Sequence, residues 1–106
     1  MNSTWKATER AIARRLGGKR VPITGRARGS APDVAHTWLS IEVKHRKRLP
    51  RWLADAIDQA VAAAVEGQLP IVILHESGQR HDNDLVLTRL SDFESWFGSI
   101  GGDDED

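Results

Sequence analysis

The stretch DVAHTWLSIEVKH, residues 33–45, contains the side-chain alternation that decides the fold of this chain. Beyond Leu39, polar and apolar side chains alternate with a period of two, which predicts a strand with one apolar face. The polar face carries Ser40, Glu42, Lys44 and Arg46, and the apolar face carries Ile41, Val43 and His45. A turn near His36–Thr37 makes the whole stretch a hairpin, and without that turn it is a single bent strand. The pair Glu42 and Lys44 is consistent with a solvated sheet face and also with a functional site.

The sequence around this hairpin predicts one α/β domain over residues 1–100. Helices are predicted over residues 3–16, 50–67 and 91–100, and further strands over residues 19–23, 69–76 and 84–90. Ser3 or Thr4 caps the first helix, the glycines at 17–18 stop it, and Ser91 caps the last helix. The core-facing stripe of the first helix is Trp5, Glu9, Ile12, Ala13 and Leu16. The order α-β-β-β-α-β-β-α predicts a mixed central sheet flanked by helices. Residues 101–106, GGDDED, are predicted to be a disordered acidic tail.

The chain of 106 residues has no net charge, but its charges are segregated along the sequence. Residues 1–51 contain 13 Lys or Arg and 3 Asp or Glu, a net charge of +10, whereas residues 52–106 contain 2 and 12, a net charge of −10. A basic half is typical of proteins that bind nucleic acid; the alternative is a match of opposite charges within the chain or across a dimer. The sequence shows no cysteine, no secretory signal and no apolar run long enough to span a bilayer, so we expect a cytoplasmic protein without a membrane partner.

Three carboxylates and one lysine are candidates for a metal site. Glu9 interrupts the apolar stripe of the first helix, Asp33 opens the hairpin, and Glu42 and Lys44 share one face of its second strand. A turn at residues 36–37 places Asp33 opposite residue 40 and diagonal to Glu42. Clustered carboxylates are costly to bury unless a cation neutralises them, and Mg²⁺ prefers such oxygen ligands. A metal ion can activate water and a neighbouring ammonium can stabilise charge on phosphate, so this set favours hydrolysis of phosphodiester bonds.

Each candidate also has a simpler structural interpretation. Glu42 and Lys44 can form an exposed ion pair, which contributes under about 1 kcal/mol. Asp33 can be an ordinary strand-start aspartate behind a proline. Glu9 can pair with a neighbour at the margin of its helix. One metal site, however, explains all four residues together.

The pair Pro32–Asp33, followed after eight residues by Glu42, Val43 and Lys44, resembles the motif of the PD-(D/E)XK nuclease superfamily. Glu9 in an upstream helix and the order of elements are also similar to that superfamily. Within it, the small size and the glycine-rich basic loop most resemble the Holliday junction resolvases of archaea and phages. The resemblance covers about residues 4–76 and implies a restriction-endonuclease-like α-β-β-β-α-β core.

The resemblance also implies roles for particular residues. The implied ligands of Mg²⁺ or Mn²⁺ are Asp33, Glu42, the backbone carbonyl of Val43, and Glu9. Lys44 is implied as the catalytic lysine, so that the catalytic set is Glu9, Asp33, Glu42 and Lys44. Two further residues are weaker matches to family positions: Gln59 in the helix after the lysine strand, and Ser30 in the loop before Pro32.

The remaining charged and aromatic residues are given more general interpretations. Several cations are predicted to contact DNA phosphates, although a solvated surface is the alternative: Arg10, Arg14, Arg26, Arg28, Arg46, Lys47, Arg48 and Arg51. The histidines lack the helical spacing and the cysteine partners of zinc sites, and are predicted to be surface or packed residues: His36, His45, His75 and His81. The tryptophans are predicted to pack in a core or a dimer interface: Trp5, Trp38, Trp52 and Trp96.

The sequence therefore predicts a metal-dependent, structure-selective DNA endonuclease, with Holliday junction resolution in phage DNA recombination as the leading function. Symmetric cutting of a four-way junction needs two active sites, so a homodimer is expected. Two alternatives stay open: a nuclease or nickase that acts on ordinary duplex or branched DNA, and a non-catalytic DNA-binding module on the same fold.

Overall fold

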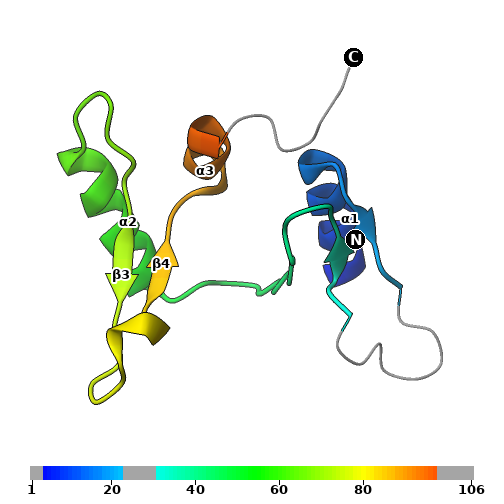
Figure 1. Ribbon diagram of the computed structural model, residues 1–106, viewed down its shortest axis with the longest axis horizontal. Coiled ribbons are helices and arrows are strands. Elements are labelled where there is room, and N and C mark those ends of the chain that lie inside the picture. Colours follow the sequence, from blue (N-terminus) through cyan, green and yellow to red (C-terminus); the bar gives the residue numbers. More distant parts are fainter. Residues whose placement is uncertain (1–3, 23–30, 98–106) are drawn as a thin grey trace. The chain divides into compact units, whose positions relative to one another are not determined.

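The computed structural model describes residues 4–22 and 31–97 of the chain (Figure 1). These described residues form three α-helices and two small antiparallel sheets, so the protein is of the mixed α/β class, as predicted. The chain divides into two compact units. The N-terminal unit includes the described residues up to Lys47, and the C-terminal unit runs from Arg48 to Phe97 in the described part. Each unit is described by itself below.

The N-terminal unit begins with helix α1, Trp5–Leu16, which ends at the predicted residue and starts directly after Thr4, one of the two predicted caps. The Thr4 hydroxyl accepts a hydrogen bond from the amide of Ala7, which caps the first turn. Gly17 ends the helix in the left-handed conformation, with φ of 74°. Gly18 follows where a Cβ atom would lie 2.3 Å from the carbonyl oxygen of Ala35, so only glycine fits this close approach. The glycine pair therefore both stops α1 and lets it pack on the sheet.

The buried face of α1 follows the predicted stripe, although Ile12 is only half-buried and Trp5 is exposed. Glu9, Ala13 and Leu16 are buried and pack toward the sheet of the same unit. Trp5, at the start of the stripe, is 44% exposed. The first turn of α1 therefore extends beyond the core that its second and third turns cover.

Strands β1, Lys19–Arg20, and β2, Val34–Ala35, pair antiparallel beside α1. The amide of Val21 donates to the carbonyl of Asp33 at 2.9 Å, which extends this pairing by one residue. The predicted third strand is reduced to a single bridge between Val34 and Ile41. Residues 23–30 lie outside the described part of the chain, together with the end of the predicted strand 19–23.

The hairpin that follows β2 has a different register from the predicted one. Val34 faces Ile41, so the turn is centred after residue 37, and Asp33 lies level with residues 41–42 instead of residue 40. The reason is local: Nδ1 of His36 accepts hydrogen bonds from the amides of Trp38 and Leu39, at 3.2 and 3.3 Å, and so builds the turn with a side chain. Sequence patterns for hairpin turns do not include this use of histidine.

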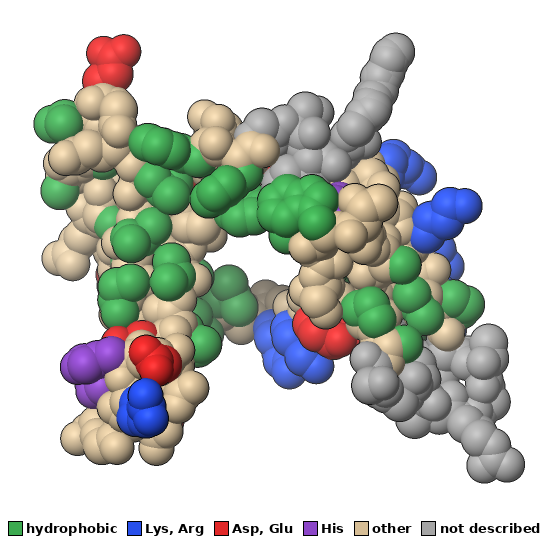
Figure 2. Space-filling view, in the orientation of Figure 1, with side chains coloured by type: hydrophobic (Ala, Val, Ile, Leu, Met, Phe, Trp, Pro, Cys, Tyr) green, Lys and Arg blue, Asp and Glu red, His purple; other side chains and the backbone are tan. Residues whose placement is uncertain are grey.

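The C-terminal unit consists of α2 (Arg51–Ala63), β3 (Val72–Leu74), the short 3-10 helix η1 (His81–Asn83), β4 (Leu85–Leu87) and α3 (Leu90–Phe97). Strands β3 and β4 form an antiparallel hairpin, and α2 packs against β3 (Figure 1). Ile57 is the buried residue of α2. In Figure 2, hydrophobic side chains spread over the visible surface of this unit. None of the helices in the described chain is long and apolar enough to cross a membrane.

Two helix boundaries of this unit differ from the prediction. Helix α2 ends at Ala63 and not at Gly67, because Gln68 closes a separate turn: its side-chain oxygen accepts from the amide of Val65, and its own amide donates to the Val65 carbonyl. Helix α3 starts at Leu90, one residue early, since the Phe93 amide donates to the carbonyl of Arg89. Ser91 therefore lies inside the helix and is not its cap.

The sheets and the tryptophans differ from expectation as well. In the described residues, all strand pairs are antiparallel and form two separate two-stranded sheets, so the parallel pairing of a mixed central sheet is not observed. The four indoles are about half exposed, so they do not pack in the core of the described part of either unit: Trp5 44%, Trp38 59%, Trp52 59% and Trp96 52%. The predicted acidic tail, 101–106, lies outside the described residues, and the single domain over 1–100 stays a prediction.

Candidate functional site

Asp33 occupies a β-bulge beside the segment that carries Glu42 and Lys44. The amides of Asp33 and Val34 both donate to the carbonyl of Ile41, at 2.9 and 3.3 Å, so two residues of one strand oppose one of the other. A bulge interrupts the alternation of side chains, and both Asp33 and Val34 are buried. The Asp33 carboxylate then accepts a hydrogen bond of 2.6 Å from the amide of Val43. Local backbone geometry thus fixes the first predicted acid against the second half of the predicted motif.

Helix α1 also contacts this segment, next to two of the predicted site residues. The hydroxyl of Thr8 and Nδ1 of His45 lie 2.5 Å apart and form a hydrogen bond. Thr8 precedes Glu9 on α1, and His45 follows Lys44. The backbone segments that carry the three parts of the predicted motif, α1, the bulge and residues 42–44, therefore contact one another in the N-terminal unit.

The second half of the motif has the predicted alternation. Ile41, Val43 and His45 are half-buried, whereas Glu42, Lys44 and Arg46 are exposed. In the described residues, neither the Glu42 nor the Lys44 side chain forms a hydrogen bond or an ion pair, so the alternative of a Glu42–Lys44 ion pair does not apply to this structure. Both side chains face solvent.

Glu9 is buried as predicted, but its carboxylate has a partner inside the protein. Nε of Arg20 donates to Oε1 of Glu9 at 2.8 Å, and the two side chains are 17% and 5% exposed. The guanidinium of Arg20 also lies over the ring of Trp5, 5.7 Å from its centroid. This ion pair offsets the cost of burying Glu9 without any metal ion.

The predicted acids do not form a group of ligand atoms close enough to share one metal ion. Over the described residues, one such group of three or more side chains is present, and it is formed by His75, His81 and Asp84 in the C-terminal unit. The Glu9 carboxylate instead pairs with the guanidinium of Arg20, which would compete with a metal ion for it. The metal site of Asp33 and Glu42 stays a prediction.

Sequence analysis missed the cluster of His75, His81 and Asp84. The spacing of five and two intervening residues fits neither a helix face nor a familiar zinc motif. The signal that was available is the loop itself: a histidine at the end of one strand, and a histidine and an aspartate just before the next strand. Cross-strand pairing brings such positions together.

The predicted DNA contacts and weaker site candidates have different outcomes. Figure 2 shows Lys and Arg side chains on the surface of the protein. The described cations of the predicted DNA-binding set are all exposed: Arg10, Arg14, Arg46, Lys47, Arg48 and Arg51. Arg26, Arg28 and Ser30 lie outside the described residues. Gln59 is exposed on α2, in the C-terminal unit, and nothing in the structure assigns it to a site.

Comparisons with known proteins give no further assignment. No protein-family model, no curated protein and no solved structure matches the chain.

Proposed function

We propose that this chain is a metal-dependent, structure-selective DNA endonuclease whose main activity is the resolution of Holliday junctions. The observation that carries the proposal is the hydrogen bond between the Asp33 carboxylate and the Val43 amide. It holds the Asp33 carboxylate against the backbone of the segment that carries Glu42 and Lys44, and this closeness supports a PD-(D/E)XK interpretation. The restriction-endonuclease-like core is part of the same proposal, since the observed elements keep the predicted order, with the third strand shortened to a bridge.

The donor atoms near Asp33 suit Mg²⁺ or Mn²⁺. Both are hard cations that take oxygen ligands, and the proposed ligands are the carboxylates of Asp33 and Glu42 and the carbonyl of Val43. When bound, such an ion supplies a more acidic water and neutralises charge on the phosphate. Glu9 is a less suitable metal ligand, because one oxygen of its carboxylate already forms an ion pair with Arg20.

In this proposal, the cationic side chains of the protein stabilise charge on the reacting phosphate and bind the DNA backbone. The exposed ammonium of Lys44 is available to orient the attacking water or to stabilise charge developing on the phosphate. Exposed cations on α1 and after Lys44 hold the DNA backbone, including Arg10, Arg14, Arg46 and Lys47. A homodimer then presents two sites to the two strands that must be cut.

A cleavage assay with matched variants tests the proposal. The protein is incubated with a four-way junction, a linear duplex and a single strand, each with Mg²⁺, Mn²⁺ or EDTA. Asp33→Asn keeps an oxygen that can accept from the Val43 amide but loses the charge, and Lys44→Ala loses the ammonium. Each is expected to lower the cleavage rate by about 100-fold or more. The control variants, Asp55→Asn and Arg80→Ala, remove exposed charges in the C-terminal unit and should leave the rate within about twofold of the wild type.

The outcomes separate the alternatives. Metal-dependent cutting of the junction alone supports resolution, and equal cutting of linear duplex supports the broader nuclease or nickase. Cutting that persists in Asp33→Asn or Lys44→Ala rules out the assigned site. For a protein that neutralises Z phosphates, the logarithm of the DNA-binding constant falls with the logarithm of the salt concentration with a slope of about −0.9Z. An affinity that does not change with salt would therefore show that the basic half does not contact the DNA backbone.

One observation favours the second candidate, a non-catalytic DNA-binding module. The ion pair of Glu9 with Arg20 gives the third acid a structural role, and Asp33 supports the hairpin through Val43. Junction binding with no metal-dependent cutting of any substrate would establish this module in place of the nuclease.

A further inference from the structure

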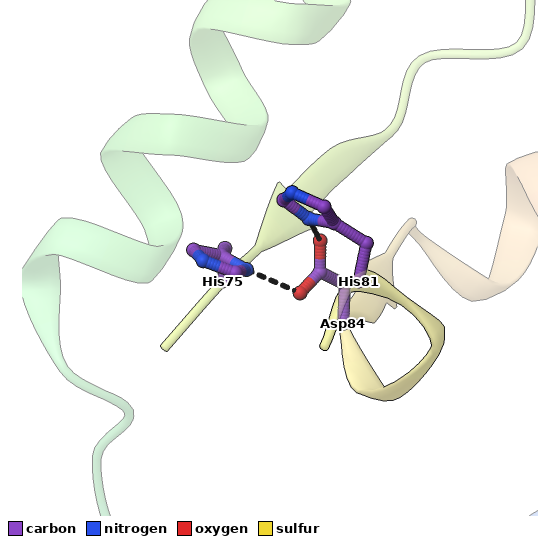
Figure 3. Close-up of side chains that lie close together, drawn as sticks. All are labelled: His75, His81 and Asp84. Atoms are coloured by element: carbon purple, nitrogen blue, oxygen red, sulfur yellow. Dashed lines mark hydrogen bonds and ion pairs between the residues drawn. The ribbon is translucent and has the colours of Figure 1, made fainter. Parts of the chain in front are cut away.

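Two imidazoles and a carboxylate form a cluster at the end of the β3–β4 hairpin (Figure 3). The carboxylate of Asp84 lies between the rings: Oδ1 is 2.6 Å from Nδ1 of His75, and Oδ2 is 3.0 Å from Nδ1 of His81. The ring centroids are 4.5 Å apart. One ligand atom from each residue lies within 4.8 Å of those of the other two. Three side chains thus point toward one small volume.

Two backbone elements hold these residues together. Leu74 pairs with Leu85, and the same register continued by one residue places His75 opposite Asp84. The 3-10 helix η1 begins at His81, and its next-turn residue is Asp84, whose amide donates to the His81 carbonyl at 3.0 Å. Residues three apart in a 3-10 helix lie on the same side. Main-chain geometry therefore positions the cluster, in addition to the hydrogen bonds within it.

The composition and spacing of the cluster suit a transition metal. Two histidines and one carboxylate are the ligands of three-residue zinc and non-haem iron sites. Zn²⁺ bonds of about 2.0–2.1 Å in a tetrahedron separate neighbouring ligand atoms by roughly 3.3 Å. The two Nδ1–O distances in the cluster, 2.6 and 3.0 Å, differ from that spacing by at most about 0.7 Å. The larger difference is that between His75 and Asp84. The side chains of His75 and His81 are 37% and 84% exposed, so both rings have room to turn by the small amount required.

We propose that His75, His81 and Asp84 bind a Zn²⁺ ion, with water completing the coordination. The carboxylate of Asp84 is only 13% exposed, so its charge is partly desolvated. A cation bound between the three side chains neutralises that charge. Mg²⁺ does not suit this site, because Mg²⁺ prefers oxygen ligands and keeps several bound waters, whereas two of the three ligands here are imidazole nitrogens. A bound ion ties His75 to Asp84 across the hairpin and so clamps the connection between β3 and β4. The proposal does not rest on the nuclease function, whose acids belong to the N-terminal unit.

Metal titration of the tag-free protein tests the site. Co²⁺ serves as a spectroscopic substitute for Zn²⁺, because tetrahedral Co²⁺ absorbs much more strongly in the visible than octahedral Co²⁺. The wild type is expected to bind one Co²⁺ with the strong tetrahedral absorption, and one equivalent of Zn²⁺ should displace it. Calorimetry then gives the Zn²⁺ affinity. His81→Gln is expected to weaken it by about tenfold or more, and the exposure of His81 makes this variant safe for folding.

Two controls make the outcome decisive. Asp82→Asn removes a carboxylate that is 80% exposed on the same hairpin, and it should keep the wild-type affinity. Asp33→Asn with Glu42→Gln removes the proposed Mg²⁺ ligands, and it should keep the tetrahedral Co²⁺ signal. Absence of one-to-one binding by the wild type, or equal Zn²⁺ affinity in His81→Gln, overturns the proposal. Loss of the signal in the Asp33 and Glu42 variant also overturns it, since the ion would then lie in the other unit.

Discussion

Removing one partner of the buried Glu9–Arg20 ion pair is expected to destabilise the N-terminal unit strongly. Glu9→Leu leaves a guanidinium that is 17% exposed without its carboxylate. Breaking a buried pair costs about 3–5 kcal/mol. The residual exposure of Arg20 and its position over the Trp5 ring offset part of this cost, so we expect the low end, about 3 kcal/mol. For a domain of this size, that corresponds to a fall in Tm of roughly 12 °C or more.

The double variant Glu9→Leu with Arg20→Met completes the measurement. Replacing a buried ion pair by two apolar side chains of similar volume is often neutral, so the double variant should lie within about 1 kcal/mol of the wild type. Each single variant, in contrast, leaves a buried charge. Urea unfolding followed through the NMR amide signals of Ala13 and Leu16 reports the stability of this unit separately from that of the other.

Two results would refute this reasoning. If Glu9→Leu costs less than about 1 kcal/mol, the ion pair contributes no more than an exposed one. If the cost of the double variant equals the sum of the single costs, Glu9 and Arg20 are energetically independent. The same cycle bears on function, because a Glu9 needed only for stability can be replaced in the double variant without loss of metal-dependent cleavage.

Two further variants test local features of the N-terminal unit. Gly18→Ala is expected to lower the free energy of unfolding in urea by about 1–3 kcal/mol, because the new methyl group meets the Ala35 carbonyl and forces the backbone to move. Stability equal to the wild type would show that α1 is free to shift away from β2. His36→Ala is expected to lower the free energy of unfolding by about 1 kcal/mol, because the amides of Trp38 and Leu39 lose their acceptor. His36→Asn should recover most of this loss, since asparagine side chains also accept from nearby amides. Equal losses in the two variants would show that the side chain at position 36 does not stabilise the turn.

The features that the sequence predicted well are local ones. Helix α1 has its start and stop encoded within a few residues, at Thr4 and Gly17, and its buried stripe follows from helical periodicity. The exposure of Glu42 and Lys44 follows from the alternation of the segment that contains them. The burial of Glu9 was also predictable, because its position on the stripe leaves its side chain facing the sheet.

The features that were missed depend on contacts between distant residues. Arg20 belongs to the basic half of the sequence, and nothing in its neighbours reveals that it pairs with Glu9, eleven positions earlier. The hairpin register depends on the His36 side chain and on a bulge, neither of which alters the pattern of residue types. The cluster of His75, His81 and Asp84 is invisible to motif spacing because a strand pair and a 3-10 turn build it jointly.

The bulge at Asp33 has a consequence for how chains of this kind can vary in length. Because the amides of Asp33 and Val34 both donate to the carbonyl of Ile41, the strand that contains Asp33 has one residue more at this point than the segment opposite it. A deletion of one position from the hairpin can remove the bulge, and an insertion can move it, and in either case the side chain at position 33 changes faces. Natural or engineered variants that keep the Asp33–Val43 contact should therefore keep this spacing, even where every residue between 35 and 40 is replaced.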